Sequence, residues 1–277
     1  MVYPMKQLLV SLICIILIFS TSCTTESDKY GNISIRFSHE VNGIPLETDT
    51  LKYQNEAENY FSISELKYFI SDFALVKSDG SIIEAGEKPM THYVDYDLPE
   101  TMIWMLPDSI PAGVYKSISF TFGLDEETNH NGLFTTPPEY LMQMPDEQGG
   151  GYYYMQMKGK YANIIGVNEN NYEFFLGIGQ IHPAHGFGAD ETTFVHNHFT
   201  ITINNISFEL DANEEVTLNL TMEIENWLRN PHTWNFYTTG GHIATNQDAQ
   251  IMAKENGIDV FSAQVEEIRD TPRENHQ

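Results

Sequence analysis

Basic residues are scarce in this sequence of 277 residues. Lys and Arg number 14 against 39 Asp and Glu, which gives a formal charge of −25 at pH 7. A protein that binds the phosphate backbone of nucleic acid needs clustered basic side chains to release counterions, so this charge balance excludes nucleic acid as a partner. The chain is still expected to fold, because 41% of its residues are hydrophobic and 12% are aromatic, unlike a disordered acidic segment.

Long apolar runs are also missing, except near the first residue. There, Lys6 precedes an apolar run at residues 8–19, which is too short to span a bilayer comfortably, and small residues follow up to Ser22. A cationic start, a short apolar stretch and small residues are typical of a secretory signal peptide. The sequence therefore predicts a signal peptide at residues 1–22.

Cysteine is nearly absent, and the two cysteines, Cys14 and Cys23, both lie in this region. Cys23 directly follows the small residues, as in the lipobox of bacterial lipoproteins. This resemblance implies that Cys23 is lipidated and anchors the mature protein to a membrane; the alternative is a soluble secreted protein with a free thiol. With Cys23 lipidated, the mature domain would hold no free thiol for a disulfide, a metal or a nucleophile.

The rest of the chain divides into three expected parts. Residues 23–30 would form the lipidated cysteine and a polar tether, residues 31–262 one folded domain, and residues 263–277 a flexible, charged tail. The acidic residues just after Cys23 resemble the surface-export signals of some Gram-negative lipoproteins. We therefore expect an outer-membrane lipoprotein in the cell envelope of a Gram-negative bacterium, facing the periplasm or the cell surface.

Short segments that alternate apolar and polar residues dominate the domain and predict half-buried strands. They lie at residues 33–37, 66–76, 93–96, 115–122, 152–157, 172–178, 199–203, 206–210 and 216–224. One helix is expected at residues 246–255, with Thr245 as its N-cap and Gly257 at its end. Because strands do not alternate with long amphipathic helices, the predicted fold is all-β: an antiparallel β-sandwich with long loops and one short C-terminal helix.

Six phrases in the domain carry a family resemblance. They are FSHEVNGIPL at 37–46, YFISD at 68–72, PAGVY to FGLD at 111–125, GGGYYYM at 149–155, LGIGQ at 176–180, and NQDA to DVF at 246–261. Together they resemble the MbnP-like family, secreted partner proteins named after methanobactin, in the version common among Bacteroidota lipoproteins. The resemblance implies an all-β, often lipidated protein. It also implies copper binding through two histidines and an oxidised tryptophan, and as partner a di-haem peroxidase-like protein or an outer-membrane transporter.

The chain departs from this family at the positions that matter most for copper. Tyr153 and Phe175 stand where related sequences carry histidines, and Met144 stands where a tryptophan is often found. The ligands of the best understood branch therefore have no counterparts at these positions.

Other histidines are clustered and could hold a metal. His182, His185, His196 and His198 fall within 17 residues, and imidazole suits copper and zinc. Residues two apart on a strand point to the same face, so His196 and His198 are expected side by side, with the loop of His182 and His185 near them. The alternative is a solvated strand face on which these histidines bind only water or nearby acidic side chains.

Two isolated histidines are weaker candidates. His39 follows the first predicted strand and is expected to be a structural residue. His232 lies two residues before Trp234, an indole that copper chemistry could oxidise, although a buried tryptophan that caps the sandwich is the ordinary interpretation.

No motif for catalysis is present: the sequence contains neither a Gly-x-Ser-x-Gly elbow nor a Gly-rich phosphate loop, and no spacing singles out a pair of carboxylates. With the family resemblance and the clustered histidines, we predict a non-catalytic lipoprotein that binds or delivers a soft or borderline metal ion, copper before any other. An alternative is a surface module that binds glycans through exposed rings of Tyr152, Tyr153 and Tyr154. A structural lipoprotein within a larger envelope complex would show neither property.

Overall fold

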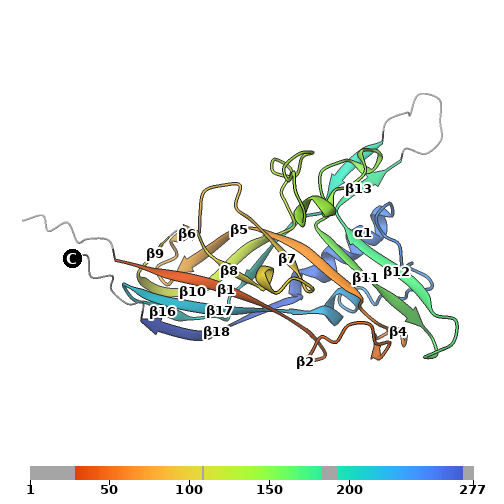
Figure 1. Ribbon diagram of the computed structural model, residues 1–277, viewed down its shortest axis with the longest axis horizontal. Coiled ribbons are helices and arrows are strands. Elements are labelled where there is room, and N and C mark those ends of the chain that lie inside the picture. The colour runs from red at the N-terminus through yellow and green to blue at the C-terminus, as the bar shows by residue number, and fades with distance from the viewer. Residues whose placement is uncertain (1–28, 108, 183–191, 271–277) are drawn as a thin grey trace, which may run out of the picture.

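The computed structural model describes residues 29–107, 109–182 and 192–270, and strands dominate this part of the chain (Figure 1). Within it, six strands form one sheet: β1 (Tyr30–Val41), β2 (Ile44–Pro45), β8 (Ile103–Met105), β9 (Ile110–Pro111), β17 (Glu214–Glu223) and β18 (Phe261–Asp270). The predicted all-β class is confirmed.

The second sheet contains ten of the described strands. They are β3 (Tyr53–Gln54), β4 (Tyr60–Phe61), β5 (Glu65–Lys77), β6 (Ile82–Glu84), β7 (Thr91–Asp95), β10 (Gly113–Phe122), β11 (Met155–Ala162), β12 (Asn170–Leu176), β15 (Phe199–Ile203) and β16 (Phe208–Leu210). The strands β13 (Ile178–Ile181) and β14 (Thr193–His196) form a separate hairpin that projects from one end of the molecule (Figure 1).

Helices are short. The α-helix α1 (Gln247–Asn256) lies beside the β13 hairpin (Figure 1). The 3-10 helices are η1 (Pro99–Met102), η2 (Glu139–Met142), η3 (Asp146–Gln148), η4 (Ile224–Leu228) and η5 (Gly257–Asp259). Among the described residues, no helix has the length and apolar character that a membrane crossing requires.

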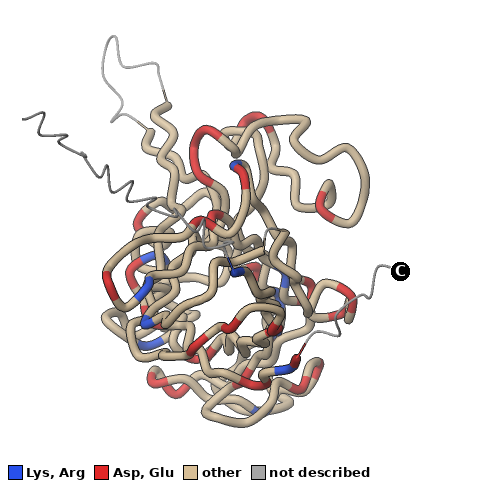
Figure 2. The backbone as a smooth tube through the Cα atoms, turned by 90° about the vertical axis from the view of Figure 1, so that its left-hand side faces the viewer, with Lys and Arg blue, Asp and Glu red and all other residues tan. Residues whose placement is uncertain are grey.

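Alternation of side chains along β1 explains how the sheets enclose the core. Ile33, Ile35 and Phe37 are at most 3% exposed and point inward, while Arg36 is exposed and pairs with Glu266 of β18 at 2.7 Å. The inward side chains of both sheets form one apolar core, which is rich in aromatic rings. Figure 2 shows that the acidic residues lie all around the chain and not in one patch.

Four details differ from the sequence-based expectation. β1 pairs with β17 in parallel, so the sandwich is not purely antiparallel. The N-cap of α1 is Asn246, whose side chain accepts a hydrogen bond from the Ala249 amide, and not Thr245. The expected flexible tail at residue 263 is wrong as far as Asp270, because β18 pairs with β17 up to that residue. Finally, the strand expected from residue 152 begins at Met155.

Gly123 occupies a position where a side chain cannot fit, and this predicts a measurable loss of stability. Its φ is +92°, and an added Cβ would lie 2.5 Å from the Tyr154 ring; Gly80 has the same φ of +92° but open space around it. We expect Gly80→Ala to cost about 1–2 kcal/mol of unfolding free energy from backbone strain. Gly123→Ala should cost about 1–3 kcal/mol more, because the new methyl overpacks the ring.

Urea unfolding of the two variants measures this difference. Equal losses in Gly80→Ala and Gly123→Ala would show that the Tyr154 ring is not held against Gly123.

Candidate functional site

His196 and His198 lie side by side at the base of the projecting hairpin. His196 is the last residue of β14, and His198 directly precedes β15. Their ring centroids are 6.3 Å apart, with the ring planes at 65°. The strand expected to contain both residues is interrupted between them, but burial still alternates, with Asn197 buried between two partly exposed histidines. The predicted proximity of the two rings is therefore observed.

His196 contacts an acidic loop and a buried phenol. Its Nε2 is 3.8 Å from Oε1 of Glu126, and its Nδ1 is 3.4 Å from the Tyr154 hydroxyl. Burial raises the pKa of Tyr154 well above its ordinary value, so this phenol stays protonated. His196 therefore turns Nδ1 toward Tyr154 and Nε2 toward Glu126.

His198 is half buried, and its Nδ1 has no hydrogen-bond partner in the described part of the chain. Its ring stands edge-on against the ring of Tyr154, with centroids 6.1 Å apart. Burial lowers the pKa of His198 below its ordinary value, and the nearby Lys254 and His196 lower it further. His198 is thus neutral at pH 7, which is the form of imidazole that binds a metal.

A hollow of about 360 Å³ opens beside His196. It is lined by Glu126, His130, Phe194 and the glycines at 149 and 151, among others. Gly149 has a φ of +116°, and an added Cβ would lie 2.8 Å from the Ile178 side chain, so a larger residue would push this loop away from the hairpin. The hollow therefore depends on close contact between the glycine loop and β13.

Asparagine side chains hold the two loops around this hollow together. Asn129 exchanges two hydrogen bonds with the backbone of Tyr152, at 2.8 and 3.1 Å, and Asn131 accepts one from the Gly151 amide at 2.7 Å. His130 lies between these two asparagines and so faces the same hollow as His196. Sequence reasoning missed His130 because nothing in its local pattern indicates which loop it meets.

His182 does not join the pair. His182 is exposed, follows β13, and contacts Thr192 through Nδ1 at 3.2 Å. In the hairpin register Ile178 faces His196, so His182 lies at the other end of the hairpin. His185 lies outside the described residues. Within residues 29–107, 109–182 and 192–270, no three His, Cys, Asp or Glu side chains converge as a metal cluster.

His39 is a buried structural residue. It is 4% exposed, and its Nε2 makes a hydrogen bond of 3.0 Å with the Tyr68 hydroxyl. Its ring lies edge-on against the rings of Tyr68 and Tyr96. Desolvation by burial lowers the pKa of His39 to about 3, so it remains neutral in the folded protein.

His232 is also placed by local contacts and lies apart from the histidine pair. Its Nε2 contacts Glu255, and its backbone amide donates to the Asn256 side chain at 2.9 Å. The neighbouring Trp234 is fully buried, and its indole donates to the Gly240 carbonyl at 3.1 Å. This tryptophan therefore caps the core, as its ordinary interpretation predicts.

The positions where the family resemblance places copper ligands lie together in space. The rings of Tyr153 and Phe175 have centroids 5.1 Å apart, and Tyr153 donates to the Gln148 side chain at 2.8 Å. An added Cβ at Gly177 would lie 2.8 Å from the Met144 sulfur and 3.2 Å from the Tyr153 ring. Aromatic rings and one thioether occupy this location, so it does not fit the two-histidine copper site that the family resemblance implies.

The proposed glycan platform is wrong. Tyr152 and Tyr154 have no exposed surface and Tyr153 is 7% exposed, so none of the three rings can stack on a sugar at the surface. The Tyr152 hydroxyl instead donates to the Phe134 carbonyl at 2.8 Å. The prediction of an exposed ring failed because all three tyrosine side chains, on both sides of the segment, are buried in the protein.

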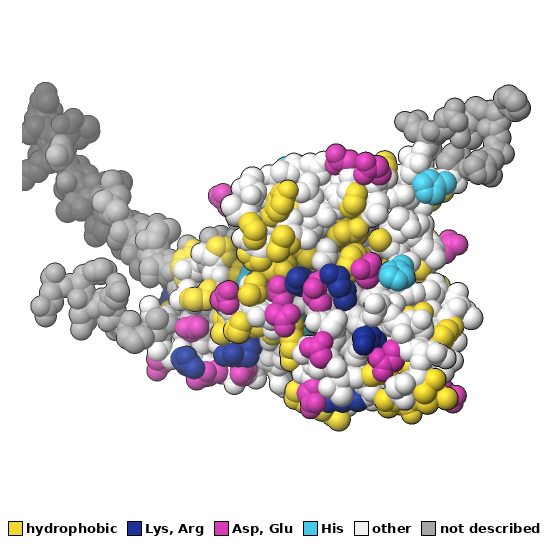
Figure 3. All heavy atoms as spheres, turned by 45° about the vertical axis from the view of Figure 1, so that its right-hand side comes forward, with side chains coloured by type: hydrophobic (Ala, Val, Ile, Leu, Met, Phe, Trp, Pro, Cys, Tyr) yellow, Lys and Arg dark blue, Asp and Glu magenta, His cyan; other side chains and the backbone are white. Residues whose placement is uncertain are grey.

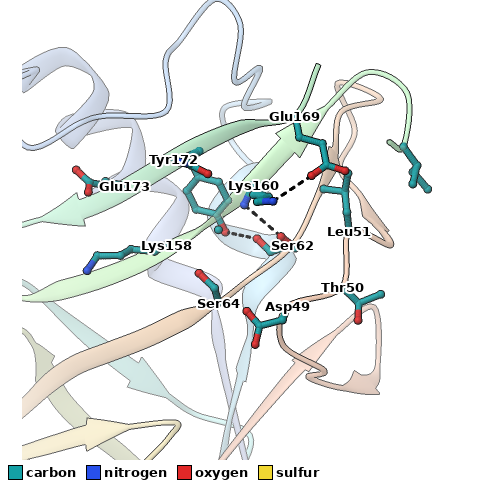
Figure 4. A pocket seen from close by; sticks show the side chains of 13 residues that line it. Asp49, Thr50, Leu51, Ser62, Ser64, Lys158, Lys160, Glu169, Tyr172 and Glu173 are labelled. Carbon is teal, nitrogen blue, oxygen red and sulfur yellow. Dashed lines mark hydrogen bonds and ion pairs between the residues drawn. The ribbon is translucent and has the colours of Figure 1, made fainter. Parts of the chain in front are cut away.

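A larger hollow of about 610 Å³ lies near the hairpin of β11 and β12 (Figure 4). Its two lysines are already paired: Lys160 is 3.2 Å from Glu169, and Lys158 is 3.0 Å from Glu65. The ring of Tyr172 is 1% exposed, and no histidine is among the lining residues. This hollow therefore offers neither an imidazole nor an exposed ring, whereas histidine side chains reach the surface at the right-hand end of the molecule in Figure 3.

Comparisons with known proteins agree with the resemblance in the sequence. The chain matches the MbnP family over residues 30–252. A similar solved structure is MbnP from Methylosinus trichosporium, with 12% sequence identity and a TM-score of 0.49 over 85% of this chain and 99% of that chain. No curated protein sequence matches the chain.

The buried His39 predicts a specific loss of stability in mild acid. Its folded-state pKa of about 3 lies below the ordinary value of 6.5, so only the unfolded chain takes up this proton as pH falls from 6.5 toward 3. Between pH 7 and pH 5 this costs about 2 kcal/mol of unfolding free energy. In His39→Gln, whose amide does not titrate, the loss between these two pH values should be about 2 kcal/mol smaller.

Urea unfolding at both pH values gives the comparison, with His242→Gln as a control at an exposed histidine. The same pH dependence in the wild type and in His39→Gln would contradict a neutral, buried His39.

Proposed function

Because the chain belongs to the MbnP family, we propose that it is a copper-binding protein of the cell envelope in which the imidazoles of His196 and His198 hold the ion. The observation that carries this proposal is the pair itself: two adjacent imidazoles with ring centroids 6.3 Å apart. The family is associated with copper, and this pair is where neighbouring imidazoles converge in the described part of the chain.

The protonation and hydrogen bonding of the pair support a role as ligands. His198 is neutral at pH 7, and its buried Nδ1 lacks a partner among the described residues. A buried nitrogen without a hydrogen bond is costly, and a ligand would remove that cost. The Tyr154 hydroxyl at Nδ1 of His196 can fix the tautomer of that ring, as a partner outside the coordination sphere commonly does.

The residues around the pair fit copper better than a hard cation. Copper is a soft or borderline ion, and imidazole nitrogen is a ligand suited to it. Copper bound here would be an ion that the protein can exchange with a partner. The chain offers no thiolate beyond residue 23. Affinity would therefore depend on neutral imidazole, and the carboxylate of Glu126, 79% exposed, would bring one acidic group near His196.

We further propose that the protein is not an enzyme and acts by binding copper or passing it on. A lipid at Cys23 would keep the domain at a membrane, with the periplasm or the cell surface as its location. The family resemblance suggests a di-haem peroxidase-like protein or an outer-membrane transporter as the partner that supplies or receives the ion. Such a role needs a site that solvent can reach, and the hollow beside His196 meets this need.

Replacing the pair should remove the site. We expect about one copper per chain in the wild-type protein purified without a histidine tag, and at least a 100-fold weaker affinity in His196→Ala/His198→Ala. Partners outside the coordination sphere commonly contribute about 10- to 100-fold, so loss of both ligands should exceed that range. Titration against a competing chelator, followed by metal analysis, measures the affinity.

His242→Ala is the matched control, because His242 is exposed and lies 3.4 Å from Glu173. An unchanged copper affinity in the double variant would rule out this assignment of the ligands.

A further inference from the structure

Asn197 separates the two histidines and points away from them. It is 1% exposed, whereas His196 and His198 are both partly accessible. Burial alternates along this segment, since the next buried residue is Phe199 at 6% exposure. The buried Asn197 therefore lies on the inner side, and both neighbouring imidazoles lie on the outer side. Whatever holds the Asn197 side chain therefore also decides where the two imidazoles lie.

The first turn of α1 holds this side chain. Asn197 Nδ2 donates to Oε1 of Gln247 at 3.2 Å, and Gln247 Nε2 donates back to Oδ1 of Asn197 at 3.1 Å. Asn197 Nδ2 also lies 3.0 Å from the Gly177 carbonyl. The two side-chain amides thus form a reciprocal pair that is buried between the helix and the hairpin.

Gln250, one turn further along α1, holds the turn between β12 and β13. It is fully buried, accepts a hydrogen bond from the Gly177 amide at 3.0 Å, and donates to the Phe175 carbonyl at 3.1 Å. Gln247 and Gln250 therefore attach one helix to two segments: the chain that carries the histidines and the turn between β12 and β13. Figure 1 shows α1 beside this hairpin.

A glycine on β13, Gly179, leaves room for the amide pair of Asn197 and Gln247. An added Cβ at Gly179 would lie 1.5 Å from Oε1 of Gln247 and 2.8 Å from Nδ2 of Asn197. Any larger residue would expel the glutamine from its place. Residues 176–180 and 246–249, two of the phrases noted in the sequence, thus meet in space at the segment that carries the histidines.

The contacts are strong enough to fix the position. A buried amide that loses its hydrogen-bond partners destabilises the fold, and turning Asn197 outward would leave the amide of Gln247 unpaired as well. The helix itself begins at a fixed point, because Asn246 accepts a hydrogen bond from the Ala249 amide at 3.2 Å. The start of α1 therefore fixes the position of Gln247 in the amide pair.

We propose that Gln247 is a positioning residue for the histidine pair: by holding Asn197 inward, it sets the side and the spacing of His196 and His198. This inference rests on the proposed copper site, since it names a residue that acts on copper only through those imidazoles. Gln247 hydrogen-bonds to Asn197, the residue between the two imidazoles, so its effect on a bound ion would come through geometry alone.

Gln247→Met tests the inference, because methionine keeps the length of the side chain and removes the amide. We expect copper affinity to fall by about 10- to 100-fold, the range for partners outside the coordination sphere. The electron paramagnetic resonance spectrum of the protein loaded with Cu(II) should also change, since it reports the arrangement of the nitrogen ligands. Asp248→Asn, an exposed neighbour on the same helix, should behave as the wild type.

Two further measurements separate positioning from a general loss of stability. Gly80→Ala weakens the fold at a turn with open surroundings and should leave copper affinity and spectrum unchanged. In the His196→Ala/His198→Ala background, Gln247→Met should cause no further loss of affinity. An unchanged affinity and spectrum in Gln247→Met would overturn the inference. So would an equal loss of copper affinity when Gln247→Met is added to His196→Ala/His198→Ala.

The metal-free protein distinguishes failure of this inference from failure of the proposed function. In the wild type, nuclear Overhauser contacts should connect the Tyr154 ring with His198, whose ring centroid is 6.1 Å away, and Gln247→Met should weaken them. If copper affinity does not depend on His196 and His198 but these contacts are lost in Gln247→Met, the proposed copper site is wrong and the positioning role stands. If the contacts persist in Gln247→Met, the positioning role is wrong.

Discussion

The reciprocal amide pair between Asn197 and Gln247 is the contact on which the arrangement of the histidine end depends. It fixes one buried residue, and the alternation of an extended chain then places the residues on both sides of it. The same helix turn, through Gln250, fixes the backbone at Gly177. Helix, hairpin and histidine segment are therefore one structural unit, although Gln247 of the helix is 50 residues from Asn197 in the sequence.

The sequence predicted the strands whose two faces differ in polarity. Ile33 and Ile35 alternate with polar residues and are buried as expected, and the helix near residue 250 ends at the expected Gly257, although Asn246 and not Thr245 caps its start. The parallel pairing of β1 with β17 could not be predicted, since alternation with a period of two is the same in parallel and antiparallel strands. Which strands become neighbours is decided by the packing of the whole core.

The candidate site could be predicted only in part, for related reasons. The nearness of His196 and His198 follows from local geometry alone and survives the break between β14 and β15. The burial of Tyr152 and Tyr154 does not follow, because a run of three tyrosines has no alternation that marks an inner face. His130 reaches the hollow only through contacts between two loops, which no local pattern reveals.

A site with two converging imidazoles depends strongly on their placement. No third ligand converges with the two imidazoles among the described residues, so displacement of one ring would remove one of two ligands. Affinity then comes from having the rings ordered before binding, because ordering a side chain on binding costs free energy. The rings of His196 and His198 are ordered by groups outside the site: Tyr154 on one side, and Asn197 with the helix on the other. The aromatic packing of Tyr153 and Phe175 supplies no nitrogen ligand, so the proposed copper site depends on how these outer groups hold the histidine pair.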